Sequence, residues 1–164
     1  MPELCEVEIY RRAARPLEGR QGVAVRAHDG YVLGTGSAEL ARPLVGATLG
    51  RPARLGKVLM VPFLGPHGRG DLGLRFGMTG RLVVDGAPAI TELVYGERGQ
   101  HRRHDRFVLE LDVGELRVRD ARRLGGVELD PDLSPLGPDA LDGDLSALGS
   151  QLGATRAALK SFLL

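Results

Sequence analysis

Cysteine and long apolar runs are scarce in this chain. Cys5 is its single cysteine among 164 residues, which excludes an internal disulfide and a zinc site built from several cysteines. No apolar run approaches the length of a membrane span, and the N-terminus lacks a basic segment followed by an apolar one. We therefore expect a cytoplasmic protein that does not bind membranes.

Excess charge is also missing, since the net charge is +1, which argues against a strongly basic nucleic-acid binder. Its distribution is uneven, because from Asp130 onward five aspartates outnumber Arg156 and Lys160. Lysine is rare: 20 of the 22 basic residues are arginine. Lysine, unlike arginine, can lose its proton and act as an amine. Lys57 is therefore a candidate for amine chemistry, although a solvated surface lysine is the alternative.

The chain begins with a predicted helix over residues 6–18, where apolar residues at helical spacing form one face and Pro16 and Gly19 end it. Short alternating runs punctuated by glycine then extend to about residue 130. Asp85-Gly86 and Val113-Gly114 are typical of hairpin turns. This pattern predicts an antiparallel sandwich or barrel.

From Pro131 the composition shifts to proline, aspartate and glycine, which predicts a connector with one or two helical turns. Residues 150–164 have a helical apolar pattern that ends on Phe-Leu-Leu. A second chain or self-association would have to cover that apolar face. We therefore expect an α+β fold, mainly an antiparallel β-sandwich with an N-terminal helix (residues 1–130), followed by a connector and a C-terminal helical stub (residues 131–164).

The opening stretch MPELCEVE has two interpretations. It can be a helix start, with Pro2 at the first helical position and carboxylates offsetting the helix dipole. Alternatively, removal of Met1 exposes the secondary amine of Pro2, which can attack an aldehyde carbon and form a Schiff base. Glu3 and Glu6 are near enough in sequence to protonate a leaving oxygen or hold a sugar hydroxyl.

MPELCEVE resembles the MPELPEVE start of the formamidopyrimidine-DNA glycosylase and endonuclease VIII family of base-excision repair enzymes. LRFGMTGRL resembles the family's HLGMTG loop, and HDRFVLEL with RDARRLGG resembles its HDH…DPRRFG segment. LGPDAL is similar to LGPEPL, LGKVL to the turn with a second catalytic amine, and RAALKSFLL to the start of a helix-two-turn-helix domain. Six segments in the family's order cover the whole chain.

The resemblance implies roles for the residues at the start of the chain and in the LGKVL turn. Pro2 would form the Schiff base with the sugar C1′ of a damaged nucleotide, and Glu3 would be the proton donor. Lys57 would donate a proton during β-elimination, and Glu6 would contact the sugar. The implied function is that of a DNA glycosylase and AP lyase acting on oxidised bases.

The resemblance also implies double-stranded damaged DNA as the partner, with the target nucleotide taken out of the helix. Met78 would be the wedge that fills the gap, although a lone methionine is otherwise more often core filler. His104, Arg122 and Arg123 would hold phosphates and fill the gap, and Arg156 would add a phosphate contact. His101 and His104 have no further ligand nearby, so we expect no metal site.

Several positions depart from the family pattern. Cys5 and Ala121 replace prolines, Leu124 replaces a phenylalanine as an apolar plug, and Arg75 stands where many members have histidine. The family's second half, which usually carries a zinc finger, has no counterpart here, so we expect no cofactor in this chain. The alternative function is therefore a weak or inactive remnant that at most binds DNA. An N-terminal-proline tautomerase would need neither Lys57 nor the paired arginines, and a plain binding module would leave the ordered motifs unexplained.

Overall fold

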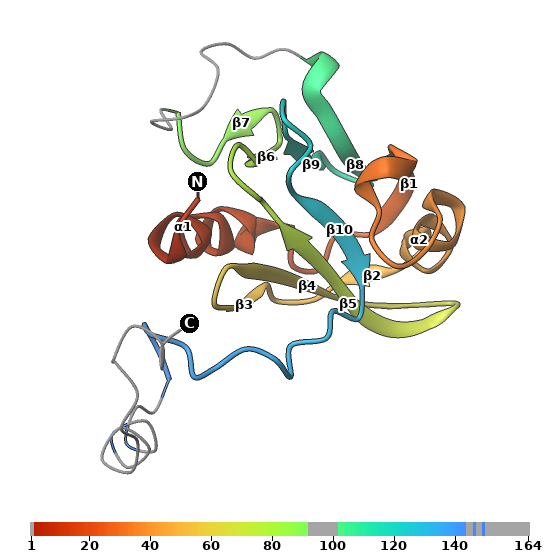
Figure 1. Cartoon of the computed structure of the whole chain (residues 1–164). Helices are drawn as coiled ribbons and strands as arrows, with labels where there is room; N and C mark the ends of the chain where they lie inside the picture. Colours follow the sequence, from red (N-terminus) through yellow and green to blue (C-terminus); the bar gives the residue numbers. More distant parts are fainter. Residues whose placement is uncertain (1, 92–101, 144–145, 147–148, 150–164) are drawn as a thin grey trace.

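The computed structural model describes residues 2–91, 102–143, 146 and 149 (Figure 1). Within them, helices, short 3-10 helices and strands alternate along the chain. The helical elements are α1 (Leu4–Ala14), η1 (Arg15–Leu17), η2 (Asp29–Tyr31), α2 (Ser37–Leu44) and η3 (Arg102–His104). None of the helices in these ranges is long and apolar enough to cross a membrane.

Helix α1 forms because apolar residues recur three and four positions apart, which places Val7, Tyr10 and Ala14 on one buried face. It begins two residues earlier than predicted. Residues 15–17 continue as a 3-10 helix, because Pro16 has no N–H with which to extend the α-helical ladder. Pro2 precedes the helix rather than taking its first position, since Glu3 is the N-cap.

Among the described residues, one sheet has the strand order β1-β8-β9-β6-β7, and every pair in it is antiparallel. Both predicted hairpin turns are confirmed: Asp85 and Gly86 have φ of 51° and 80° between β6 and β7, and Gly114 has φ of 77° between β8 and β9. The strands are β1 (Gly22–Ala27), β6 (Arg81–Val84), β7 (Ala87–Pro88), β8 (Asp105–Leu111) and β9 (Glu115–Arg119).

The second sheet has the order β10-β5-β4-β2, and the short strand β3 also pairs with β4. All of these pairs are antiparallel, and β4 and β5 are joined along their whole length from Val58↔Arg75 to Gly65↔Gly68. The strands are β2 (Thr48–Leu49), β3 (Ala53–Leu55), β4 (Val58–Gly65), β5 (Gly68–Arg75) and β10 (Gly126–Leu129).

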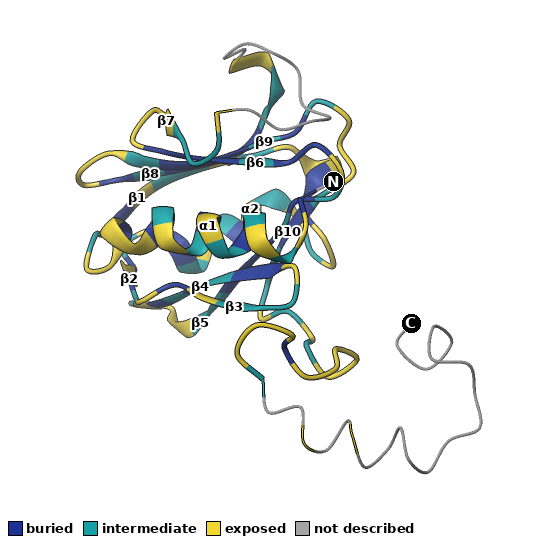
Figure 2. Ribbon diagram, turned by 90° about the vertical axis from the view of Figure 1, so that its left-hand side faces the viewer, coloured by how far each residue is buried: buried dark blue, intermediate teal, exposed yellow. Residues whose placement is uncertain are grey.

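The two sheets face each other, with α1 along one open side and α2 along the opposite side (Figures 1 and 2). Between them lies the apolar core, in which Tyr10, Tyr31 and Phe107 are among the largest fully buried side chains. Burying one such apolar side chain contributes about 1.5–3 kcal/mol. The prediction of a mainly antiparallel α+β sandwich with an N-terminal helix is confirmed.

Two parts of the sequence-based description differ from the structure. Helix α2 was not predicted, and it contains Pro43. Residues 131–143 form turns, in which Gly143 N–H donates to the Asp139 carbonyl at 2.7 Å, whereas the described residues Ser146 and Gly149 are helical, so the helix lies after residue 143. The predicted helix over residues 150–164 lies outside the described residues, and the division at residue 130 stays a prediction.

Candidate active site

The N-terminal residues are held by the first turn of α1. Pro2 is buried, and Glu3 follows it in an extended conformation as the N-cap. The Glu3 N–H donates to Glu6 Oε2 at 2.8 Å. The Glu6 carboxylate thus satisfies an otherwise unpaired backbone donor at the helix start, which fixes the direction in which Pro2 and Glu3 leave the helix.

Lys57 lies in the two-residue Gly56-Lys57 turn between β3 and β4. Gly56 has φ of 54°, a conformation that residues other than glycine adopt at a cost. Lys57 Nζ is 2.6 Å from Glu3 Oε2, and the two side chains are 49% and 56% exposed. The turn therefore brings the lysine to the carboxylate at the start of α1, where both remain accessible to a ligand.

Pro2 and Lys57 line the same pocket, of about 400 Å³, which we call the Pro2 pocket. Arg75 of β5 also lines it, and its Nε donates to Glu128 Oε1 at 2.5 Å. The wall includes Leu136 from the connector. The complete lining is Pro2, Gly56, Lys57, Val58, Arg75, Phe76, Gly77 and Leu136.

Residues 76–80 form a loop that we call the Met78 loop. It borders the Pro2 pocket, because Phe76 and Gly77 belong to both. It is a tight turn in which Gly80 N–H donates to the Phe76 carbonyl at 2.7 Å. Met78 is 38% exposed and thus projects from the turn instead of filling the core. A Cβ at Gly77 would lie 2.3 Å from the carbonyl carbon of Leu124. Glycine at this position therefore allows the Met78 loop to pack against the backbone of the loop that contains Leu124.

Arg122, Arg123 and Leu124 lie on the facing loop, all exposed. This loop is organised by Asp120, which is completely buried. Asp120 Oδ1 accepts the Arg122 N–H at 3.1 Å and the Thr79 hydroxyl at 2.5 Å. Since Thr79 belongs to the Met78 loop, one carboxylate holds both loops in place.

Asp120 Oδ2 accepts the Gly125 N–H at 2.9 Å and the Tyr31 hydroxyl at 3.3 Å. Burial and the neighbouring Asp120 carboxylate raise the pKa of Tyr31 well above its usual value, so Tyr31 stays a proton donor. The buried carboxylate therefore has four hydrogen-bond donors, from three segments of the chain.

His104 ends η3 beside the same loop, because the Asp120 N–H donates to the His104 carbonyl at 2.9 Å. The buried Arg106 strengthens this junction. Its Nε donates to the Asp120 carbonyl at 2.7 Å and its Nη1 to the Arg103 carbonyl at 3.3 Å. The structure thus brings His104, Arg122 and Leu124 to one region next to the Met78 loop.

The remaining predictions concern a further cation and a metal. Arg156 lies outside the described residues. The described part of the chain contains no group of three or more His, Cys, Asp or Glu side chains that could hold a metal ion. The expectation of a site without a cofactor stays a prediction.

Sequence reasoning assigned no role to Thr79, Arg106, Asp120 or to the buried pair Arg54–Asp139. Asp120 and Arg106 lie inside the quoted segments RDARRLGG and HDRFVLEL, and Asp139 lies inside LGPDAL. For Asp120, Arg106 and Asp139, the sequence signal for a buried, paired side chain was a charged residue within an otherwise apolar or loop-forming motif. Their partners come from distant parts of the sequence and could not be identified without the fold.

Residues 1–127 match the family model for the formamidopyrimidine-DNA glycosylase N-terminal domain. A formamidopyrimidine-DNA glycosylase of Cereibacter sphaeroides is 32% identical over 176 residues, covering 100% of this chain and 60% of the relative. That of Thioalkalivibrio sulfidiphilus is 35% identical over 158 residues, covering 90% and 52%. The chain therefore spans at most 60% of the length of these two relatives.

Solved structures agree with these matches. A crystal structure of Lactococcus lactis Fpg with DNA containing an abasic site has a TM-score of 0.73 and 24% identity, covering 99% of this chain and 60% of that one. Wild-type Lactococcus lactis Fpg (MutM) with DNA containing N7-benzyl-Fapy-dG has a TM-score of 0.61 and 27% identity, covering 78% and 43%. The chain belongs to the formamidopyrimidine-DNA glycosylase family, whose N-terminal domain it matches over residues 1–127.

Proposed function

We propose that this chain carries the catalytic residues of a base-excision DNA glycosylase and AP lyase that acts on oxidised bases. The observation that supports this most directly is the convergence at the Pro2 pocket. An N-terminal proline, a carboxylate and a lysine lie together, with Lys57 Nζ 2.6 Å from Glu3 Oε2. An amine nucleophile beside a proton-transfer group is the arrangement that Schiff-base catalysis requires.

The proposed reaction begins with the neutral amine of Pro2, exposed by removal of Met1. Its nitrogen attacks the sugar C1′ while the bond from C1′ to the damaged base breaks. Glu3, a carboxylate in its pair with Lys57, takes the proton from the new ammonium and passes it to O4′. The C1′–O4′ bond opens as the iminium forms between C1′ and Pro2.

Strand cleavage follows from the same intermediate. The iminium acidifies the C2′ proton, which solvent takes up. The C2′–H electron pair forms a C2′–C3′ double bond as the C3′–O bond breaks, and the 3′ phosphate leaves by β-elimination. Lys57 donates a proton to the departing oxygen, and the pair with Glu3 places its amine at the pocket. In this proposal Glu6 both caps the helix start and contacts the sugar.

The proposed partner is double-stranded DNA with an oxidised base. The exposed side chains of Met78 and Leu124, on loops packed against each other, are suited to fill the space that a displaced nucleotide leaves. Arg122 and Arg123, exposed beside Leu124, and His104, whose carbonyl accepts the Asp120 N–H, would contact phosphates. The solved relatives in complex with damaged DNA support this assignment.

The test is borohydride trapping on a duplex that contains one abasic site, followed by mass spectrometry of the adduct. We expect a covalent adduct at Pro2 in the wild-type chain and in Lys160→Arg, a control that alters the lysine distant in sequence. Blocking the terminal amine by retaining Met1 should abolish the adduct. If the folded chain without Met1 forms no adduct, the proposal is wrong, and the chain is a remnant that at most binds DNA.

A further inference from the structure

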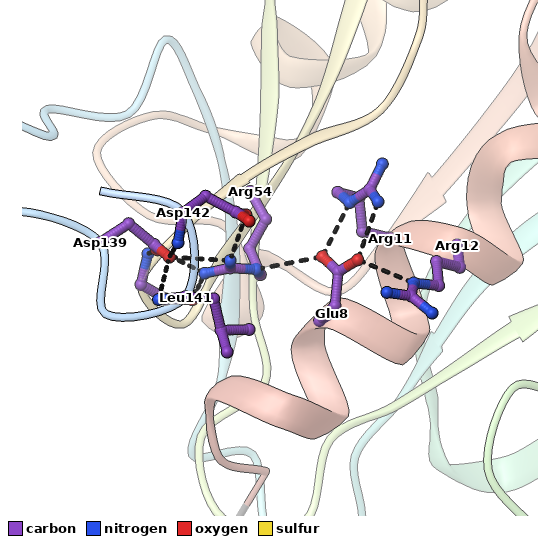
Figure 3. Close-up of polar contacts among 8 residues, drawn as sticks. Glu8, Arg11, Arg12, Arg54, Asp139, Leu141 and Asp142 are labelled. Carbon is purple, nitrogen blue, oxygen red and sulfur yellow. Dashed lines mark hydrogen bonds and ion pairs between the residues drawn. The ribbon is translucent and has the colours of Figure 1, made fainter. Parts of the chain in front are cut away.

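Arg54 of β3 lies behind the Lys57 turn with its side chain 1% exposed, and all five of its N–H donors have acceptors (Figure 3). Nη1 and Nη2 donate to the two oxygens of Asp139, the second at 2.9 Å. Nε donates to Glu8 at 3.3 Å, Nη1 also to the Gly56 carbonyl at 3.0 Å, and Nη2 also to Asp142 at 3.1 Å. A guanidinium so fully paired has one orientation.

Asp139, in the connector, is equally well paired. Its side chain is 7% exposed, and Oδ2 accepts the Gly56 N–H at 2.7 Å. Oδ1 accepts the N–H groups of Leu141 and Asp142 at 2.9 and 3.2 Å. Hydrogen bonds from Arg54 hold the pKa of Asp139 well below its usual range, so the carboxylate is charged at neutral pH.

Together, Arg54 and Asp139 hold both polar groups of the Gly56 backbone. Asp139 accepts its N–H and Arg54 donates to its carbonyl, and Lys57 is the next residue in a turn of only two. The same arginine donates to Glu8 of α1, the helix whose N-cap is Glu3. The turn with the lysine and the helix with its carboxylate partner are thereby fixed to one guanidinium.

The connector also reaches the Pro2 pocket itself. Leu136, three residues before Asp139, is the described connector residue that lines the pocket. Its side chain lies 4.0 Å from the position that a Cβ at Gly56 would take. One short segment therefore supplies both a wall of the pocket and the carboxylate behind the turn.

We propose that residues 136–141 are a positioning element of the catalytic site, in which Asp139, acting through Arg54 and the Gly56 peptide, directs the Lys57 amine toward Glu3. Asp139 is a positioning residue, since it contacts neither the amine nor the pocket. This inference rests on the proposed function for its catalytic meaning. The geometric part, that Asp139 controls the Lys57–Glu3 pair, is testable without activity.

Asp139→Asn is the test variant, and Asp142→Asn is its matched control. Both remove one carboxylate charge from Arg54, but Asp142 is exposed and makes no contact with Gly56. Reductive methylation with ¹³C-formaldehyde labels Lys57, Lys160 and the terminal amine, so each of the few signals can be assigned with Lys57→Arg and Lys160→Arg.

The readout is the change in the Lys57 methyl signal when Glu3 is replaced by glutamine, which reports the Lys57–Glu3 pair. We expect Asp139→Asn to reduce this change to less than half, and Asp142→Asn to leave it as in the wild type. An unaltered change in Asp139→Asn would overturn the proposal, as would an equal reduction in both variants. A merely structural role of Asp139 would alter stability without altering this coupling.

The catalytic arm uses single-turnover assays on the abasic duplex. We expect Asp139→Asn to slow β-elimination by about tenfold while slowing borohydride trapping at Pro2 by less than about threefold. Asp139→Glu, which keeps the charge, should recover most of the elimination rate, and Asp142→Asn should stay within about twofold of the wild type. Equal slowing of both steps by Asp139→Asn would overturn the assignment.

Two further cases are decided separately. If the wild-type chain forms no adduct, the proposed function fails, while the labelled-amine experiment still decides whether Asp139 positions Lys57. If Asp139→Asn does not fold, the double variant Arg54→Met with Asp139→Leu replaces the buried pair by apolar side chains, a change that folds tolerate well. We expect it to show the same loss of Lys57–Glu3 coupling, and retained coupling would overturn the proposal.

Discussion

Lys57 Nζ lies 2.6 Å from Glu3 Oε2, so a lysine on a hairpin turn pairs with the carboxylate that begins the first helix. Both side chains are about half exposed, and an exposed pair of this kind contributes at most about 1 kcal/mol to folding. The pair is therefore a poor device for stability. Its consequence is to hold two ionisable side chains together at the pocket that Pro2 and Lys57 line.

Glu3→Gln is expected to separate catalysis from stability. Glutamine cannot take a proton from the Pro2 amine, so trapping on an abasic duplex should slow by about 100-fold or more. The free energy of unfolding should change by less than about 1 kcal/mol, because the carboxylate is exposed. Single-turnover trapping and urea denaturation measure the two effects. Unchanged trapping in this variant would remove Glu3 from the mechanism.

Lys57→Arg is expected to affect strand cleavage more than covalent trapping. Arginine keeps the positive charge beside Glu3 but does not release a proton at neutral pH. β-Elimination should slow by about tenfold or more, while the Pro2 adduct still forms. Lys160→Arg is the matched control and should behave as the wild type. Equal elimination rates in Lys57→Arg and the wild type would show that Lys57 acts only as a charge.

Met78→Ala and Leu124→Ala are expected to weaken DNA binding without unfolding the chain. Both side chains are exposed, at 38% and 49%, so their removal leaves the core intact. The affinity for a duplex with an abasic site should fall by about tenfold in each, because the gap loses an apolar plug. Fluorescence anisotropy measures it, with Leu64→Ala on the distant end of β4 as the control. A loss in Leu64→Ala as large as in the loop variants would contradict the assignment.

Local patterns in the sequence were sufficient for much of the fold. The spacing of Val7, Tyr10 and Ala14 indicates a one-sided helix because the buried face follows directly from the helical period. Asp85-Gly86 indicates a hairpin because the turn requires positive φ at both positions. The predicted start of the first helix was wrong. The same residues fit a helix with Pro2 in its first turn and a helix in which Pro2 precedes the Glu3 N-cap, so composition does not separate the two.

Contacts between distant segments were beyond local patterns. Helix α2 was missed because Pro43 breaks the usual rule for a helix interior, although Leu40 and Leu44 are both buried at helical spacing. Pro2, Glu3 and Lys57 were candidates on their own chemistry, the resemblance implied a role for each, and these roles stay proposals. Arg54 pairs with Asp139 across 85 positions of sequence, which no periodicity or turn signal encodes.

Asp120→Asn is expected to destabilise the fold and to loosen the Met78 loop and the loop of Arg122 and Leu124. Asp120 accepts hydrogen bonds from Thr79, Arg122, Gly125 and Tyr31 while completely buried. The amide nitrogen of asparagine is a donor and would face two of these donors in place of an acceptor oxygen. We expect the free energy of unfolding to fall by about 2–3 kcal/mol. Urea denaturation measures this loss.

Thr79→Val is the control for Asp120→Asn, because it removes only one of the four donors. We expect it to cost about 1 kcal/mol. The affinity for an abasic duplex is measured under conditions in which both variants are folded. It should fall more in Asp120→Asn than in Thr79→Val, since Asp120 anchors both loops. Equal stability of Asp120→Asn and the wild type would contradict the anchoring role.

Glu8 should make the stability of the fold depend on acid pH. Hydrogen bonds from Arg11, then Arg12 and Arg54, lower the pKa of Glu8 to about 2 from its ordinary value of 4.5 (Figure 3). Because the folded pKa is depressed, this stabilisation is fully present above about pH 5 and is lost as the pH falls toward 2.

Glu8→Gln lacks the charge at every pH. Its free energy of unfolding should be lower than that of the wild type by about 1–2 kcal/mol at pH 7, since solvent screens part of the pairing, and the two should converge near pH 2. Denaturation curves collected between pH 7 and 2 test this, and a constant difference between the two proteins across that range would show that Glu8 is not held in the ionised form by its arginines.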